Sequence, residues 1–358
     1  MSANSTVTPR QALLAWYDRH RRTLPWRAEP GDRADPYHVL VSEVMLQQTT
    51  VATVTPRFRE FVTRFPTLKA LAAASIDDVL HAWQGLGYYR RARLLHQCAI
   101  AAVQHYDGRL PDKETKLLRL PGIGAYTANA VAAIAFERPV VPVDGNVERV
   151  LARLVALRAP PKTLTKEIRE AAAPFIGTER ASDCAQALME LGALICRPKN
   201  AQCARCPLSP DCLALRSGLV DEIPAKPKKT PRPERYAVSF MLCHPELGVL
   251  FRRRPETGLL AGMIEIPSTT WRETPYASKE WLAAAPVVLR DWTISSDQVR
   301  HIFTHLALNL EIARATTEEV EVADKMGGFW CPTSQFGTLA LPTLTRKVLR
   351  AAGLEVPR

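Results

Sequence analysis

The spacing of hydrophobic and polar residues in the first half of the chain predicts helices. Between positions 10 and 22, the apolar residues Leu13, Leu14 and Trp16 recur among charged residues, which is the pattern of an amphipathic helix. The segment 37–54 is mostly apolar and of helical length, so a more deeply buried helix is predicted there. Two further helices are expected from the polar segment 113–119 and the alanine-rich segment 127–136. We therefore expect this half to be mainly α-helical.

The pattern becomes typical of β-strands in the last third of the chain. Segments 236–243 and 248–253 are rich in strand formers on either side of a Pro-Glu-Leu-Gly turn, which predicts a hairpin. Apolar residues alternate along 302–312, which predicts one continuous strand. With a short segment at 330–336 and a helix at 344–354, the prediction is an α+β unit.

The two halves are separated by a segment that predicts an extended linker. Residues 223–235 contain four prolines and five Lys or Arg residues with little apolar content. The predicted organisation is therefore a helical domain at 1–222, a linker at 223–235 and a second domain at 236–358. The net charge of +11 favours a polyanionic partner.

A glycine turn joins the two short predicted helices. In Leu120-Pro121-Gly122-Ile123-Gly124, both glycines can adopt positive φ and leave their N–H groups bare at the start of a helix, where an anion is favoured. An ordinary helix connector would need no more than this. The spacing also resembles the helix-hairpin-helix turn of DNA repair proteins, in which Gly122 and Gly124 would hold the DNA backbone.

Two carboxylates stand in unusual places. Glu43 interrupts an apolar run, where burial would raise the pKa of its carboxyl toward neutrality; the alternative is a surface Glu on the polar stripe of a helix. Asp144 precedes an apolar helical pattern at 147–154, so helix capping alone would explain it. Either residue could be structural.

Four of the eight cysteines form a compact cluster, Cys196-x6-Cys203-x2-Cys206-x5-Cys212. Four thiolates at short intervals predict a metal site and not a disulfide framework. The spacing alone permits tetrahedral zinc as well as an iron-sulfur cluster.

Three motifs in order resemble the MutY-type adenine DNA glycosylases of the endonuclease III superfamily. They are Ser42 to Thr49, Gln84 to Arg90 and Val143 to Asn146, and the resemblance covers most of the first 220 residues. It implies a mainly α helix-hairpin-helix glycosylase domain with a four-cysteine loop. It also implies a 4Fe-4S cluster held by the four clustered cysteines.

The resemblance further implies roles for individual residues. Glu43 would protonate adenine at N7, and Asp144 would stabilise the positively charged sugar. Asn146 belongs to the same catalytic motif. At the position where bifunctional relatives carry a Schiff-base lysine, this chain has Tyr126, which is expected to hydrogen-bond near Asp144. Other residues are expected to bind the flipped adenine or fill the gap it leaves: Arg22, Trp26, Arg27, Leu46, Gln48, Tyr88, Gln186 and Met189.

The second domain resembles the Nudix-like C-terminal domain of the same glycosylases, most clearly in 258–263. That domain recognises 8-oxoguanine through a Phe-Ser-His turn, which here reads Phe303-Thr304-His305. The alternative is that Phe303 and His305 are plain strand residues. Too few Glu residues follow Gly262 for the magnesium site of a working Nudix hydrolase, so pyrophosphatase activity is not expected.

The expected function is a monofunctional adenine glycosylase acting on double-stranded DNA with adenine opposite 8-oxoguanine or guanine. One alternative is a bifunctional endonuclease III-like enzyme that removes oxidised pyrimidines and cleaves the strand. Another is a non-catalytic DNA-binding iron-sulfur protein. A cytoplasmic monomer without membrane association is expected, because no signal peptide or long apolar run is visible.

Overall fold

The computed structural model describes residues 7–160, 163, 165–225, 231–289 and 291–356. The chain forms two compact units, residues 1–73 with 94–228 and residues 74–93 with 229–358. The predicted linker lies partly outside the described residues, at 226–230, and the predicted boundaries at 222 and 236 remain predictions. No helix among the described residues is long and apolar enough to cross a membrane.

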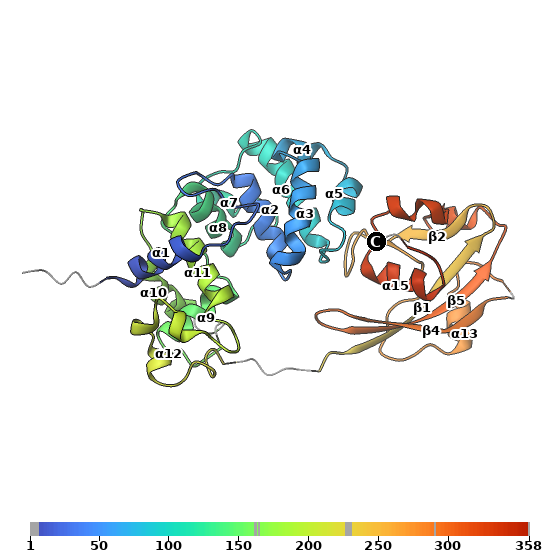
Figure 1. The fold of residues 1–358 in the computed structure, drawn as a ribbon. Helices are drawn as coiled ribbons and strands as arrows, with labels where there is room; N and C mark the ends of the chain where they lie inside the picture. The colour runs from blue at the N-terminus through green and yellow to red at the C-terminus, as the bar shows by residue number, and fades with distance from the viewer. Residues whose placement is uncertain (1–6, 161–162, 164, 226–230, 290, 357–358) are drawn as a thin grey trace, which may run out of the picture. The chain divides into compact units, whose positions relative to one another are not determined.

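The first unit is helical (Figure 1). Helix α8 packs against α2 and α11, and α11 also packs against α1 and α9, so α8 and α11 form the centre of this unit. The capping residues Thr8, Asp35 and Asp144 each accept backbone N–H bonds at the start of a helix. The helices are α1 Pro9–His20, α2 Pro36–Leu46, α3 Val51–Arg64, α4 Leu68–Ala73, α6 Arg90–Tyr106, α7 Glu114–Leu117, α8 Ala125–Phe136, α9 Gly145–Leu154, α10 Thr165–Ala172, α11 Ala181–Leu194 and α12 Leu213–Arg216.

The prediction of one helix over 37–54 is wrong at its end. Helix α2 stops at Leu46, and α3 begins at Val51. Gln48 has a φ of 57°, in the left-handed region that does not continue a helix, and the Thr50 hydroxyl caps α3. The break places Gln48 in a turn between two helices.

The second unit contains helix α5, Ile76–Ala82, and a six-stranded mixed sheet. The strand order is β3-β2-β1-β5-β4, with β6 paired to β2, and β1 runs parallel to β5. Alternating side chains pack on both faces, with α15 covering one face and α13 the other (Figure 1). The elements are β1 Glu234–His244, β2 Gly248–Arg253, β3 Ile264–Glu265, α13 Ser278–Ala283, β4 Thr293–Ile302, β5 Ala307–Thr316, α14 Val322–Lys325, β6 Gly328–Cys331 and α15 Thr343–Ala351.

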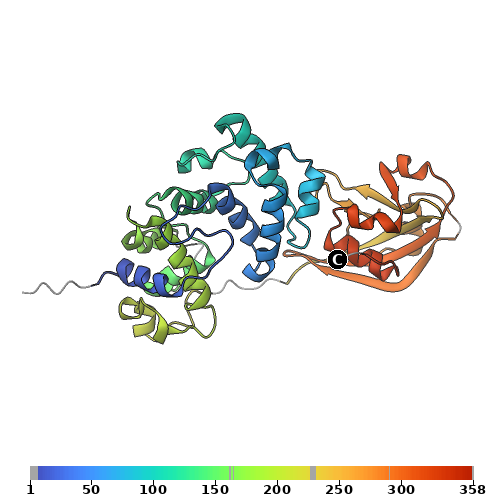
Figure 2. The ribbon, with the colours of Figure 1, turned by 45° about the horizontal axis from the view of Figure 1, so that its top comes forward.

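The predicted hairpin of β1 and β2 is confirmed, but the predicted continuous strand over 302–312 is wrong. Strand β4 ends at Ile302 and β5 starts at Ala307, so the two form an antiparallel hairpin that extends from the sheet (Figures 1 and 2). The Phe303 N–H donates to the Leu306 carbonyl at 2.8 Å and closes the turn. Leu308, Leu310 and Ile312 do point into one core, as the alternation predicts. The alternating residues between Ile302 and Ala307 instead form the turn.

Candidate active site

A cavity of about 740 Å³ in the helical unit gathers most of the predicted site residues. Its wall contains all four predicted catalytic residues, which are contributed by α2, the start of α8 and the start of α9. They are Glu43, Tyr126, Asp144 and Asn146. The residues predicted to contact the substrate that line the same cavity are Arg22, Trp26, Arg27, Leu46, Gln48, Gln186 and Met189.

The Glu43 side chain is buried, with the residue only 7% exposed. The alternative of a surface Glu on a polar stripe is therefore wrong. Burial raises the pKa of the carboxyl from 4.5 to about 7, and the nearby charge of Asp144 acts in the same direction. A hydrogen bond from Tyr126 and the charge of Arg27 oppose this rise. The carboxyl thus titrates near neutrality while facing the cavity.

Tyr126 makes a hydrogen bond near Asp144, and its partner is Glu43, which the sequence analysis did not name. Its hydroxyl donates to Glu43 Oε2 at 2.6 Å. The reason is tertiary packing: α8 lies against α2, which brings the second residue of α8 to Glu43. Burial and the neighbouring Glu43 raise the pKa of Tyr126, so it remains a neutral donor.

Asp144 caps α9 and lines the cavity at once. Its Oδ1 atom accepts the N–H groups of Asn146 at 3.0 Å and Val147 at 2.8 Å, while Oδ2 accepts from Asn146 Nδ2 at 2.9 Å. The capping role is therefore observed, and it does not exclude a chemical one. Three donors and the positive end of a helix hold this carboxylate in one orientation.

Glu190 is a site residue that the sequence analysis missed. It is fully buried on α11 and accepts from Arg22 Nε at 2.9 Å and Arg27 Nη1 at 2.5 Å. Both arginines line the cavity, so their ion pairs with Glu190 fix the positions of their guanidinium groups. The signal was available, since Glu190 interrupts an apolar helical run just as Glu43 does.

Arg149 was also missed, and it connects the cavity to the cysteine loop. It is 8% exposed, and its guanidinium donates to Asn146 Oδ1 at 2.9 Å and to the Cys196 carbonyl at 2.7 Å. Asn146 in turn donates to Asp144. A chain of three hydrogen bonds therefore runs from the first clustered cysteine to the capping carboxylate.

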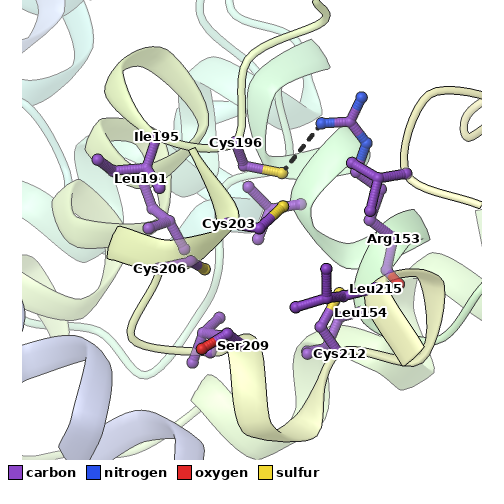
Figure 3. A pocket seen from close by; sticks show the side chains of 13 residues that line it. Arg153, Leu154, Leu191, Ile195, Cys196, Cys203, Cys206, Ser209, Cys212 and Leu215 are labelled. Carbon is purple, nitrogen blue, oxygen red and sulfur yellow. Dashed lines mark hydrogen bonds between the residues drawn. The ribbon is translucent and has the colours of Figure 1, made fainter. Parts of the chain in front are cut away.

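The four clustered cysteines line one apolar pocket, and Figure 3 shows their side chains around a shared space. The buried Arg153 donates to Cys196 Sγ at 3.4 Å. None of the four forms a disulfide bond. Among the described residues, no three His, Cys, Asp or Glu side chains come close enough together to hold one metal ion. Four thiolates around one apolar pocket are donors that suit either a zinc ion or an iron-sulfur cluster.

Of the two glycines in the predicted phosphate turn, only Gly122 adopts positive φ, at 74°. Gly124 does not use this freedom: it has an extended conformation, with a φ of −91°, and is the N-cap of α8. An added Cβ at Gly122 would lie 2.6 Å from Leu94 Cβ, whereas one at Gly124 would meet nothing within 4 Å. The turn needs glycine at position 122 because of its backbone conformation. At position 124, no neighbouring atoms cover the start of α8.

Replacing Gly122 by Ala is therefore expected to lower the free energy of unfolding by about 1–3 kcal/mol, the usual cost of a strained left-handed residue, with the Leu94 contact adding to it. Chemical denaturation measures this difference. Gly124→Ala is the matched control and should cost less, because it meets no steric contact and loses only a preferred N-cap residue. Equal stability of the two variants would contradict the assigned turn geometry.

The remaining predicted recognition residues lie in the second unit. Thr304 and His305 are exposed in the turn between β4 and β5, while Phe303 is half-buried. Tyr88, which is 50% exposed, has its hydroxyl 2.9 Å from Thr304 Oγ1. Tyr88 is thus not a core residue, although its neighbour Tyr89 is buried.

Residues 41–174 match the family described as HhH-GPD superfamily base excision DNA repair protein, and residues 238–351 match the NUDIX domain. With the glycine turn and the two-carboxylate cavity, this defines a helix-hairpin-helix DNA glycosylase. The chain is 34% identical to human adenine DNA glycosylase over 402 residues, covering 95% of this chain and 73% of that protein. It belongs to the adenine DNA glycosylase family.

The helical part of the chain is also similar to a further relative and to a solved structure. The adenine DNA glycosylase of Mycolicibacterium smegmatis is 47% identical over 197 residues, which are 55% of this chain and 66% of that one. A solved structure of a thermostable thymine-DNA glycosylase is 26% identical, with a TM-score of 0.51, and covers 57% of this chain and 94% of that chain.

Proposed function

We propose that this protein hydrolyses the N-glycosidic bond of adenine in DNA during base excision repair, where the adenine is paired with 8-oxoguanine or guanine. One observation carries the proposal: a carboxyl that titrates near pH 7 and a firmly held carboxylate line the same cavity. Glycosidic cleavage requires this pair, a proton donor for the leaving group and a negative charge beside the sugar.

Glu43 is the proton donor in this proposal. Adenine leaves poorly as an anion, and protonation of a ring nitrogen such as N7 converts it to a neutral leaving group. A carboxyl whose pKa lies near 7 holds its proton at neutral pH and can still release it. The Tyr126 hydroxyl occupies Oε2, so Oε1 is the oxygen left to carry the proton toward the base.

Asp144 faces the sugar in this proposal. Bond breaking leaves an oxocarbenium-like sugar, and a nearby fixed carboxylate stabilises that charge without having to reorganise. The two backbone donors at Oδ1 keep the carboxylate oriented. Water then completes the hydrolysis at the sugar.

The cavity is large enough for a base flipped out of the duplex. Trp26 offers an aromatic ring for stacking, and Arg22 and Arg27 offer donors whose positions are set by Glu190. Gln48, in the turn after α2, is suited to occupy the gap left in the DNA. In the second unit, the exposed Thr304 hydroxyl is suited to read the opposite base.

The four cysteines would hold a 4Fe-4S cluster. The four cysteine side chains surround one apolar pocket, and four thiolates are the ligands that a 4Fe-4S cluster takes. When bound, the cluster would cross-link the loop from Cys196 to Cys212. Through Arg149, that loop would support the Asn146 and Asp144 pair.

A single assay with two readouts tests the proposal. The wild-type protein is incubated with duplexes that carry adenine opposite 8-oxoguanine, guanine or thymine, and alkali then reveals abasic sites. Release from the first two duplexes and not the third is expected. A parallel incubation with borohydride should give little covalent adduct, since Tyr126 stands where a Schiff-base lysine would be required.

Three outcomes would overturn parts of this proposal. Strong borohydride trapping, with release of oxidised pyrimidines, would favour an endonuclease III-like enzyme. Tight DNA binding without any base release would favour a non-catalytic protein. A brown protein with a visible charge-transfer band is expected, and a colourless protein containing zinc would remove the iron-sulfur assignment.

The pH dependence of base release should respond to Tyr126. Its hydrogen bond favours the ionised form of Glu43 and so lowers the pKa of that carboxyl. Tyr126→Phe removes the donor, and the pKa of Glu43 should rise. Because the protonated carboxyl is the active form, the alkaline decline in single-turnover rate should move to higher pH. A shift to lower pH, or none, would contradict the proposed role of Glu43.

A further inference from the structure

The turn proposed to read the opposite base is fixed by an aromatic stack within the second domain. The Phe303 ring stacks on Trp271, with centroids 5.7 Å apart and an interplanar angle of 26°. His301 meets Phe303 from another side at 4.5 Å and 62°. Phe303 is therefore half-buried against two rings, while Thr304 and His305 stay exposed. Phe303 thus anchors the turn to the domain, and Thr304 and His305 are the residues that can contact the base.

Contacts with Arg254 fix the Trp271 side chain. The Arg254 guanidinium lies 5.0 Å from the Trp271 ring centroid, and its Nε donates to the Leu259 carbonyl at 3.0 Å. Arg254 is also ion-paired with Glu265, which is 8% exposed and receives Arg252 Nε at 2.9 Å. The backbone next to Trp271 is fixed as well, because Arg272 exchanges two backbone hydrogen bonds with Tyr236 on β1.

We propose that Trp271 is a positioning residue that sets the selectivity for the base opposite adenine. The inference rests on the proposed function of the turn. A hydroxyl discriminates between 8-oxoguanine and guanine only through a hydrogen bond, which weakens steeply with small errors in distance and angle. Trp271 prevents such errors by stacking on Phe303, and Glu265 and Arg254 keep Trp271 in place. The stack thus pre-organises the Thr304 hydroxyl before DNA binds.

The test compares four variants of the full-length protein on duplexes with adenine opposite 8-oxoguanine or guanine. Trp271→Ala should reduce the ratio of single-turnover rates for the two duplexes by about tenfold, because misplacement by a fraction of an ångström has large effects on such contacts. The rate on the guanine duplex should change little. Trp271→Phe retains a stacking ring and should keep most of the preference. Thr304→Ala should match Trp271→Ala.

Trp330→Ala is the matched control. Trp330 is a partly exposed tryptophan on β6 that contacts His244 and packs with the core on the other face of the sheet. It should leave the rate ratio unchanged, even if the melting temperature falls. Comparison with this variant separates positioning of the turn from general weakening of the domain.

The outcomes distinguish the recognition role of Thr304 from the positioning role of Trp271. A wild-type protein without preference for 8-oxoguanine would overturn the proposed recognition function and this inference with it. If Thr304→Ala loses the preference while Trp271→Ala keeps it, only the role of Trp271 is overturned. Equal losses in Trp271→Ala and Trp330→Ala would also overturn it, since the effect would then be nonspecific.

Discussion

Glu43→Gln is expected to lower the single-turnover rate of adenine release by at least 10²- to 10⁴-fold, the usual contribution of a positioned general acid. Glutamine keeps the size of the side chain, and its carbonyl can still accept the Tyr126 hydroxyl, but it has no acidic proton to transfer. The measurement is alkali-revealed strand cleavage at fixed times on a duplex with adenine opposite 8-oxoguanine. DNA affinity should remain close to that of the wild-type protein.

The stability of the same variant separates catalysis from folding. At pH below 4.5 the carboxyl is protonated in both the folded and unfolded protein. Its folded pKa of about 7 exceeds the unfolded value of 4.5, so stability is lost as the pH rises between them. At pH 8 the loss amounts to roughly 3 kcal/mol. Glu43→Gln should therefore raise the melting temperature at pH 8 while strongly lowering the rate of base release.

Two results would contradict this account of Glu43. Base release at the wild-type rate would exclude it as the proton donor. A lower melting temperature for Glu43→Gln than for the wild-type protein at pH 8 would mean that the ionised Glu43 carboxylate stabilises the folded state. The pKa of Glu43 would then not be raised.

The helical architecture could be predicted from local signals, whereas local signals only singled out the two carboxylates and the family resemblance was needed to give them roles. Glu43 stood out as a charge within an apolar run, and burial on α2 is what such a run implies. Where a local signal was ambiguous, the prediction failed. Alternation over 302–312 is the same for one strand as for two strands joined by a turn, and only the pairing of β4 with β5 separates them.

The side-chain partners within the site could not be predicted, because they depend on how distant helices pack. The Tyr126 hydroxyl reaches Glu43 through the contact of α8 with α2, across 83 positions of sequence. Glu190 meets Arg22 across 168 positions through the contact of α11 with α1. Periodicity identifies the apolar face of a helix, but it does not identify the helix that covers that face.

Asp144→Asn should lower the rate of base release by about 10²- to 10³-fold or more, the range seen when one preorganised electrostatic contact is lost. Asparagine is as good an N-cap as aspartate, so the bonds to Asn146 N and Val147 N and the start of α9 should survive. The negative charge beside the sugar disappears, together with the hydrogen bond that Oδ2 accepts from Asn146 Nδ2. DNA binding should persist and the melting temperature should change little.

Asp35→Asn is the matched control, because Asp35 caps α2 through the N–H groups of Tyr37 and His38 but does not line the cavity. The same substitution at an equivalent capping position should leave base release unchanged. If both variants lose activity equally, the effect of Asp144 is structural. If neither loses activity, the developing positive charge is stabilised by some other group, and the pairing of a proton donor with a fixed carboxylate no longer describes this site.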